Sequence, residues 1–379
     1  MNVLRRGVVA FLVLKLANLT INLVTFPVLA DPPPAARDRS TRRSRSVSLL
    51  VPMRDEAHRL AGSLPGILAQ DVDELILLDD CSTDDTGGLA RALSTSLTHA
   101  RVVAGAPTPP GWTGKTWACS QLAAEASSEI LVFCDADILL APGAVDLVLA
   151  QMERQQADLL SVFPQQLTET LGEHLIVPLV DDVLLCFLPF PLLRLEAPSA
   201  ATANGSVMAF DRLAYEVLGG FDIVRDELVE DVALARLTRR SGLQLGLVLG
   251  GSVVRTRMYT GYSECVTAFA RGLLPVTGGS RARLVLIAVW HLIAYTLPAL
   301  LCWRQPRWSL PLLLAATERL AVEAKTGRRK WWQAILPPLS PLAALPVFAL
   351  ALRDTQQWKG RSYRHAATPG PPSTSGGGA

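Results

Sequence analysis

The stretch Ser128–Asp137 reads SEILVFCDAD, an apolar run that ends abruptly in two carboxylates. A short, continuous run of this kind, bounded by polar residues, predicts a buried β-strand. Asp135 and Asp137 follow it two positions apart, so their side chains point the same way. Two like charges held close together in a buried place need a neutralising partner, and a hard divalent cation with oxygen ligands is one. The stretch therefore predicts a strand that ends at a functional site.

Two similar runs precede this strand. SVSLLVP occupies residues 46–52 and ELILLDD occupies residues 74–80, with helical patterns at Ala57–Ala69 and Thr86–Ser96 between the runs. This alternation predicts an α/β fold, Rossmann-like, with a mostly parallel sheet. In such open sheets ligands bind beyond the carboxyl ends of the strands, which is where the acidic residues fall.

Composition limits the class of protein. The chain has 379 residues, 50% of them hydrophobic, with 36 basic against 34 acidic residues and a mean hydropathy of +0.29. These values exclude a disordered chain, and the balanced charge gives no reason to expect a nucleic-acid partner. The six scattered cysteines contain no C-x-x-C pair, which argues against a structural zinc site. The hydropathy is that of a chain that is partly soluble and partly membrane-embedded.

The first apolar run, Gly7–Ala30, has 24 residues, enough to span a bilayer. It fits either a signal peptide cut after Ala30 or a retained anchor. The anchor is favoured because the run is long for a signal peptide. Lys15, Asn18 and Asn22 also share one helical face within it, where they could meet another helix. We expect a transmembrane anchor over residues 7–30.

The rest of the chain divides by composition. We expect a linker over residues 31–46, a soluble domain over 47–280, a membrane region over 284–352 and a tail over 353–379 that contains WKGRSY and a disordered end. Five arginines follow the first run against two before it, so the positive-inside rule puts the soluble domain on the cytoplasmic side of the cell membrane. The protein is thus expected to be multi-pass.

The C-terminal membrane region contains three apolar segments of different quality. Leu284–Trp303 carries no formal charge, whereas Ser309–Ala324 contains three charged residues and makes a poorer span. Ile335–Leu352 contains four prolines, which predicts a broken or re-entrant segment rather than a straight helix.

Three further motifs place polar residues near predicted strand ends or in loops. VPMRDEA (51–57) and LLDDCSTDDT (77–86) each end a predicted strand, and a carboxylate there can accept hydrogen bonds from a base or a ribose. PGWTGKTWA (110–118) offers a lysine after a glycine, which suits a phosphate contact, although P-loop spacing is absent. Strand-end turns and helix caps are the structural alternatives.

A later group follows in the order NGSVMAF (204–210), GGFD (219–222) and EDVALA (230–235). Glu230 and Asp231 open an apolar helical pattern, where the helix dipole favours acidic residues. Helix capping and a general base are both open roles for them.

Taken in this order, the motifs resemble those of family 2 glycosyltransferases with the GT-A fold, over roughly residues 47–260. The GWTGKTW loop, the N-terminal anchor, the C-terminal apolar segments and WKGRSY (358–363) are most similar to the membrane glycosyltransferases associated with carotenoids and hopanoids. The Q-x-x-R-W motif of processive relatives is absent, which favours transfer of one sugar over polysaccharide synthesis.

The resemblance implies roles for individual residues. Asp231 would be the catalytic base and Asp137 would hold the divalent cation, Mg²⁺ or Mn²⁺. The residues expected to bind the nucleotide sugar are Pro52, Glu56, Asp80, Lys115 and Asp135. The residues expected on the acceptor side are Glu230, Trp358 and Arg361.

The function expected is inverting, metal-dependent transfer of a hexose from a donor such as UDP-glucose to a carotenoid- or hopanoid-like lipid at the bilayer surface. Leu175–Leu193, which two acidic residues and three prolines spoil as a span, is expected to lie on the bilayer and line the acceptor entrance, with buried core as the alternative. Two other functions stay open: a polyprenyl-phosphate glycosyltransferase, and a membrane-anchored nucleotide-sugar-binding protein without catalysis.

Overall fold

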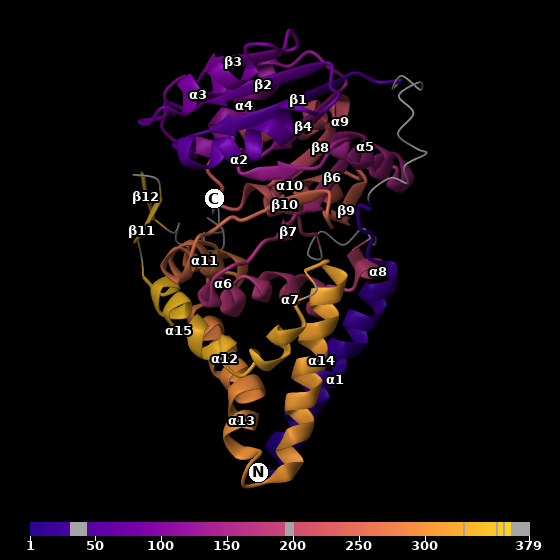
Figure 1. Cartoon of the computed structure of the whole chain (residues 1–379), viewed down its shortest axis with the longest axis vertical. Coiled ribbons are helices and arrows are strands. Elements are labelled where there is room, and N and C mark those ends of the chain that lie inside the picture. Colours follow the sequence, from indigo (N-terminus) through magenta and orange to yellow (C-terminus); the bar gives the residue numbers. More distant parts are fainter. Residues whose placement is uncertain (31–43, 194–200, 329, 354, 359–360, 365–379) are drawn as a thin grey trace, which may run out of the picture.

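The computed structural model describes residues 1–30, 44–193, 201–328, 330–353, 355–358 and 361–364. It has an upper part built on a sheet and a lower part of helices that narrows to the N-terminus (Figure 1). The expected linker over 31–46 and the expected tail over 353–379 lie largely outside the described residues.

The central sheet has seven strands in the order β3-β2-β1-β4-β8-β6-β9. Their bounds are β1 Val47–Met53, β2 Glu74–Asp79, β3 Ala100–Ala104, β4 Ile130–Cys134, β6 Leu159–Phe163, β8 Val207–Asp211 and β9 Leu245–Leu249. Strand β8 runs antiparallel to both of its neighbours, and the other neighbouring pairs are parallel. The predicted α/β fold with a mostly parallel sheet is confirmed.

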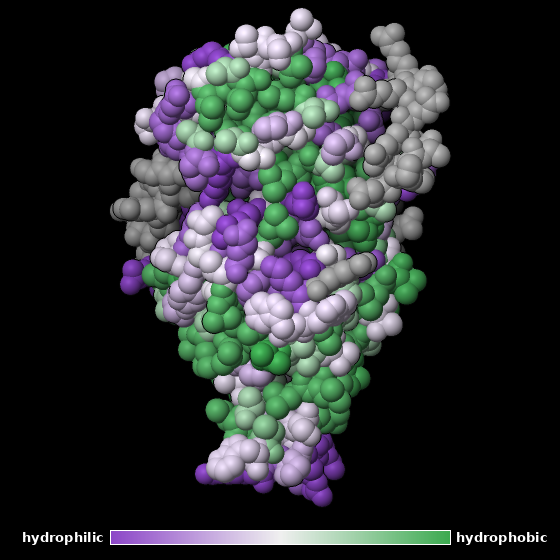
Figure 2. Space-filling view, in the orientation of Figure 1, coloured by the Kyte–Doolittle hydropathy of each residue, from purple (hydrophilic) through white to green (hydrophobic). Residues whose placement is uncertain are grey.

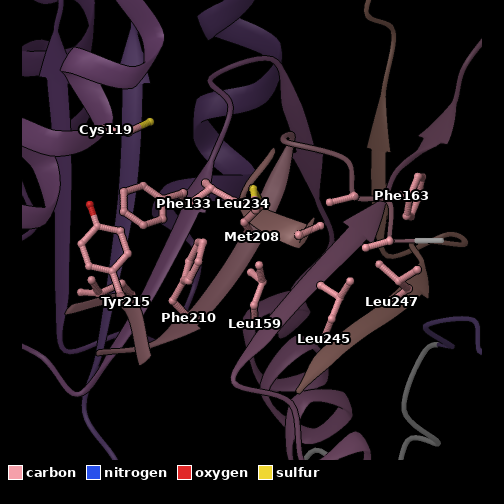
Figure 3. Close-up of a cluster of buried hydrophobic side chains, with 14 of the residues drawn as sticks. Cys119, Phe133, Leu159, Phe163, Met208, Phe210, Tyr215, Leu234, Leu245 and Leu247 are labelled. Carbon is pink, nitrogen blue, oxygen red and sulfur yellow. The ribbon is translucent and has the colours of Figure 1, made fainter. Parts of the chain in front are cut away.

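Helices cover both faces of the sheet because apolar strand residues alternate between the faces. The covering helices are α2 Ala57–Leu68, α3 Thr86–Ser94, α4 Gly114–Glu125, α5 Ala144–Gln155, α9 Arg212–Leu218 and α10 Glu230–Arg240. Leu49 and Val51 of β1 join one core cluster, whereas Leu50 between them joins the other. Phe133 and Phe210 pack edge to face in the second cluster, with ring centroids 5.9 Å apart (Figure 3).

A small second sheet lies below the first and is followed by helices. Its strands are β5 Ile138–Leu140, β7 Gln165–Gln166 and β10 Val254–Thr256. The helices are α6 Leu171–Ile176, α7 Pro178–Phe187, α8 Phe190–Leu193 and α11 Tyr262–Val276. The segment expected to rest on the bilayer is therefore mostly helical; Leu184 and Leu185 are buried, while Val183 and Phe187 are about half exposed.

Among the described residues, two helical stretches are long and apolar enough to cross a membrane: α1 Asn2–Thr25 and Arg281–Leu301. The second comprises α12 Arg281–His291, the π-helix η4 Leu292–Thr296 and α13 Leu297–Leu301. Helix α14 Ser309–Lys325 packs along α1. On the face drawn in Figure 2, apolar residues gather on the lower, helical part, above a hydrophilic tip.

The proline-rich segment enters the bundle and returns. At its start Lys330 donates to the carbonyl of Thr168, and farther on Thr296 donates to the carbonyl of Pro338 at 2.8 Å. Helix α15 Ser340–Ala351 then leads back to α11. The segment ends in the hairpin of β11 Thr355–Trp358 and β12 Arg361–Arg364; the side chains of Trp358 and Arg361 lie outside the described structure.

Candidate active site

The loops after β1 and β2 are tied together by hydrogen bonds. The backbone N–H of Asp80 donates to the Met53 carbonyl at 2.8 Å, and that of Glu56 donates to Thr86 Oγ1 at 2.8 Å. Asp55, with a φ of 51°, turns its carboxylate to accept from the N–H of Thr83 at 2.7 Å. Since the two strands are already paired in register, the loops form one unit that fixes where Glu56 and Asp80 lie.

Asp84, in the same motif, has a structural role. Its carboxylate accepts from the N–H of Ala57 at 3.1 Å and from that of Thr86 at 3.0 Å. Both are donors at the beginnings of helices, which have no partner within the helix. The capping alternative is correct for this residue.

A cavity of about 470 Å³ opens beyond the carboxyl ends of the strands. All six residues expected on the donor and metal side line it: Pro52, Glu56, Asp80, Lys115, Asp135 and Asp137. The opposite wall comes from the loop before α11 and from α11 itself, through Met258, Tyr259, Glu264, Thr267, Ala268 and Arg271. The topological rule for open sheets, applied to the sequence, predicted the first wall but not the second.

Lys115 joins two acidic groups inside the site. It lies in the first turn of α4, which Thr113 caps by accepting from the N–H of Thr116. Its ammonium is 2.9 Å from Asp135 Oδ1 and 3.3 Å from Glu230 Oε1. Burial alone would lower the pKa of Lys115, but these two carboxylates raise it well above its ordinary value. Lys115 is therefore a permanent cation between the strand end and α10.

Asp231 lies in the first turn of α10, beside this cation. Its Oδ2 accepts from the N–H of Gly205 at 2.7 Å, and the Gly205 carbonyl accepts from Lys115 at 3.2 Å. A Cβ on Gly205 would lie 3.2 Å from both Lys115 Nζ and Glu230 Oε1, so a larger residue here would push these two groups aside by a few tenths of an ångström. Burial and the neighbouring Glu230 raise the pKa of Asp231 to about 7. A carboxyl group with this pKa can accept a proton near neutrality.

Glu230 and Asp231 are not among the residues that line the cavity. Glu230 was expected on the acceptor side, but its carboxylate pairs with Lys115, which lines the donor side. Asp231 is connected to Lys115 through Gly205, whose N–H donates to Asp231 and whose carbonyl accepts from Lys115. The acidic pair therefore adjoins the cavity at Lys115.

Asp137 has an electrostatic surrounding that suits a divalent cation. Burial, Asp135 and Glu56 raise the pKa of Asp137 to about 6, and its ion-pair partner is Arg59, with Nη1 3.6 Å from Asp137 Oδ2. Among the described residues, five carboxylates line the cavity against four cationic side chains: Glu56, Asp80, Asp135, Asp137 and Glu264 against Arg54, Arg59, Lys115 and Arg271. An excess of carboxylate oxygens over cations is the donor set that Mg²⁺ or Mn²⁺ requires. The residues present fit such an ion.

The sequence of the site region matches a known family. Residues 48–171 match the profile described as Glycosyl transferase family 2. Over these residues the chain is similar to that family.

The predicted resemblance, including that to carotenoid-associated enzymes, is therefore confirmed. A relative of this chain is the 4,4'-diaponeurosporenoate glycosyltransferase of Staphylococcus aureus (strain USA300). It is 24% identical over 336 residues, which cover 84% of this chain and 88% of the relative.

Two solved structures are similar to this chain. A mannosyltransferase from Pyrobaculum calidifontis in complex with GDP-Man and Mn²⁺ is 20% identical, with a TM-score of 0.46, covering 90% of this chain and 97% of that one. A glucosyl-3-phosphoglycerate synthase from Mycobacterium tuberculosis in complex with Mn²⁺ and UDP is 23% identical, with a TM-score of 0.40, covering 67% and 88%.

The sequence analysis did not predict several residues of the candidate site. Arg59 follows Glu56 by three positions at the start of a predicted helix, so helical spacing could have indicated it. Glu264 and Arg271 reach the cavity from a part of the chain that carries no recognised motif. No local signal identifies them, because only the packing of α11 under the sheet brings them to the site.

Proposed function

We propose that this family 2 glycosyltransferase transfers a single hexose from a nucleotide-diphosphate sugar to a lipid acceptor, with inversion at the anomeric carbon. The observation that carries the proposal is the cavity itself. It gathers Glu56, Asp80, Asp135 and Asp137 at the strand ends and is closed by α11, a helix that packs on the apolar segment α15.

On the donor side, Asp80 lies at a strand end with its side chain buried at the cavity, which suits a hydrogen bond from a base or a ribose hydroxyl. Asp135 is held by Lys115 and would contact the donor beside it. Asp137 would hold a divalent cation, Mg²⁺ or Mn²⁺, which when bound takes up negative charge that grows on the leaving diphosphate. Pro52 and Glu56 would complete the nucleotide-sugar pocket.

In the transfer, Asp231 is proposed to remove the proton from the acceptor hydroxyl. The acceptor oxygen forms its bond to the anomeric carbon as the bond from that carbon to the diphosphate oxygen breaks. Because one displacement inverts the configuration, a single base suffices and no enzyme nucleophile is required. The hydrogen bond from Gly205 at 2.7 Å holds the Asp231 carboxylate in place.

The acceptor is proposed to be a carotenoid- or hopanoid-like lipid. Helix α11 contacts the cavity on one side and packs against α6 and α15 on the other, so an apolar acceptor could approach from the bundle. The half-exposed Val183 and Phe187 of α7 suit a helix that rests on a bilayer. The relative from Staphylococcus aureus is named for 4,4'-diaponeurosporenoate, which agrees with a carotenoid-like acceptor. That name denotes a carboxylate, and for an acceptor carboxylate the base would matter much less than for the hydroxyl proposed here.

For the membrane arrangement we propose that α1 is a retained anchor and that Arg281–Leu301 crosses outward and α14 returns. The sheet part and the re-entrant segment would then both be cytoplasmic, where nucleotide sugars are made. The many basic residues at 37–45 and 325–330 agree with this orientation.

The experiment that tests the function uses membranes that contain the full chain, incubated with labelled UDP-glucose or GDP-mannose and Mn²⁺. Mass spectrometry of labelled lipid should detect a neutral glycolipid. A sugar-phospholipid product would instead support the polyprenyl-phosphate alternative. Metal-dependent nucleotide binding without any labelled lipid would support the binding protein without catalysis.

A further inference from the structure

The Arg59 guanidinium lies among three carboxylates from three parts of the chain. Nη2 is 2.9 Å from Glu264 Oε1, whereas Nη1 is 3.6 Å from Asp137 Oδ2 and 3.8 Å from Glu56 Oε2. The short contact is thus to Glu264 on α11, and the two longer contacts are to the strand-end side. Arg59 is shared between the proposed metal carboxylate and the opposite wall of the cavity.

Glu264 is fixed in its position by contacts other than Arg59. Its second oxygen, Oε2, accepts from the N–H of Thr260 at 2.7 Å and from the Thr260 hydroxyl at 2.9 Å. The beginning of α11 is also held at α6, where a Cβ on Gly172 would meet the Cβ of Tyr262 at 2.5 Å. Glu264 therefore presents Oε1 to Arg59 from a fixed point.

In this arrangement, Arg59 and a metal ion would compete for the Asp137 carboxylate. A divalent cation at Asp137 and the Arg59 guanidinium are both positive, so each weakens the binding of the other to the same carboxylate. Glu264 attracts the guanidinium in the opposite direction. Without Glu264, the remaining ion pairs of Arg59 would be those with Asp137 and Glu56. The affinity of the site for a cation would then fall.

We propose that Arg59 acts as a resident counter-ion that competes with the metal for Asp137, and that Glu264 holds Arg59 back so that the metal can bind. The inference rests on the proposed function, because it takes Asp137 as the metal carboxylate. Arg59 and Glu264 are both positioning residues. Through them, metal binding is coupled to α11, the helix that forms the acceptor-side wall of the cavity.

The test measures Mn²⁺ affinity of the full chain in detergent, with UDP present, by the electron paramagnetic resonance signal of free Mn²⁺. Arg59→Gln should raise the affinity about two- to fivefold, and Glu264→Gln should lower it by a similar factor, as for the loss of one partly exposed ion pair. Arg59→Lys keeps the charge and should stay near the wild type, which also shows that the position tolerates substitution.

The double variant Arg59→Gln with Glu264→Gln is decisive. If Glu264 acts through Arg59, the double variant binds Mn²⁺ as Arg59→Gln does, within about twofold. If Glu264 acts only as a nearby negative charge, its loss lowers affinity equally in both backgrounds. Glu216→Gln, whose carboxylate is 3.9 Å from Arg212 on the far helix α9, is the matched control and should change nothing.

The outcomes separate this inference from the function on which it rests. An equal effect of Glu264→Gln with and without Arg59, or no effect at all, overturns the inference while the metal site stands. If the wild type binds no Mn²⁺, or Asp137→Asn binds it as tightly as the wild type, the proposed metal site fails and the inference fails with it.

Discussion

The ammonium of Lys15 on α1 lies 3.0 Å from the carboxylate of Glu318 on α14, although 303 residues separate them in the chain. The same ammonium is 2.8 Å from Asp182 on α7 and 2.5 Å from the hydroxyl of Tyr295 in η4. Lys15 is 3% exposed. Removing α1 would leave two carboxylates in an apolar bundle without their shared cation, which supports the proposal that α1 is a retained anchor.

Lys15→Met should destabilise the protein by about 3–5 kcal/mol, because it leaves buried charges without a partner. The measurement is thermal unfolding of the purified chain in detergent. Adding Glu318→Gln to Lys15→Met should recover part of the loss. Arg6→Met, on the exposed part of the same helix, is the control and should have little effect. Equal stability of the Lys15 and Arg6 variants would contradict a structural role for the cluster.

Asp137→Asn should abolish metal-dependent turnover and Mn²⁺ binding while the unfolding temperature stays close to that of the wild type. The substitution is nearly isosteric and removes the charge that a cation needs. Transfer from a labelled nucleotide sugar, followed across a Mn²⁺ titration, is the measurement. Full activity of this variant at low divalent cation would refute the assignment of Asp137.

Asp231→Asn should retain donor binding and lose about 10²–10⁴-fold in transfer to a hydroxyl acceptor. A base acts when deprotonated, and the pKa of Asp231 is raised to about 7, so the wild-type rate should increase as pH rises through that value. This limb of the pH profile should be absent in the variant. A loss below about tenfold would mean that Asp231 serves only the first turn of α10.

Glu173→Gln should reduce stability at neutral pH by about 3 kcal/mol. The Glu173 carboxylate is fully buried and accepts from the N–H of Gly261 at 2.8 Å and from Arg257 at 3.0 Å, which holds the loop that carries Tyr259 into the cavity. Burial alone would raise the pKa of Glu173, but hydrogen bonds led by that from Arg257 lower it to about 2.

Because this pKa is depressed, the stabilisation by Glu173 is present above its ordinary value of 4.5 and is lost as pH falls from there towards 2. Urea unfolding at a series of pH values should show the wild type approaching the variant in that window. Glu169→Gln, at a side chain that is mostly exposed although it pairs with the same Arg257, is the control. A constant difference between Glu173→Gln and the wild type down to pH of about 2 would contradict the linkage.

Cysteines introduced at Ser44 and Ser362, in a background without the native cysteines, should both be protected from an impermeant thiol reagent on intact cells. The two positions flank the proposed membrane segments, and the proposed re-entrant path would return the chain to the side of the sheet. Labelling at 362 alone would indicate that Ile335–Leu352 crosses the membrane as a straight span.

The sequence by itself determined the elements whose signal is local. The predicted helix Ala57–Ala69 is observed as Ala57–Leu68, and the strand before Asp135 and Asp137 is buried as expected. The polar face of α1 was also predictable, since Asn22 binds the carbonyls of Leu185 and Leu188 as helical spacing suggested. Such features follow from hydrophobic periodicity and strand-end chemistry, which act over a few residues.

Only the tertiary structure decided which distant residues form ion pairs with one another. Arg59 and Glu264 are 205 positions apart, and nothing near either residue predicts a pairing. The pairing of Glu230 with Lys115 and the antiparallel insertion of β8 between β4 and β6 also depend on how whole elements pack. Local sequence determines whether a segment is a helix or a strand, but the electrostatic partners of a buried group are set by the burial of all the apolar faces together.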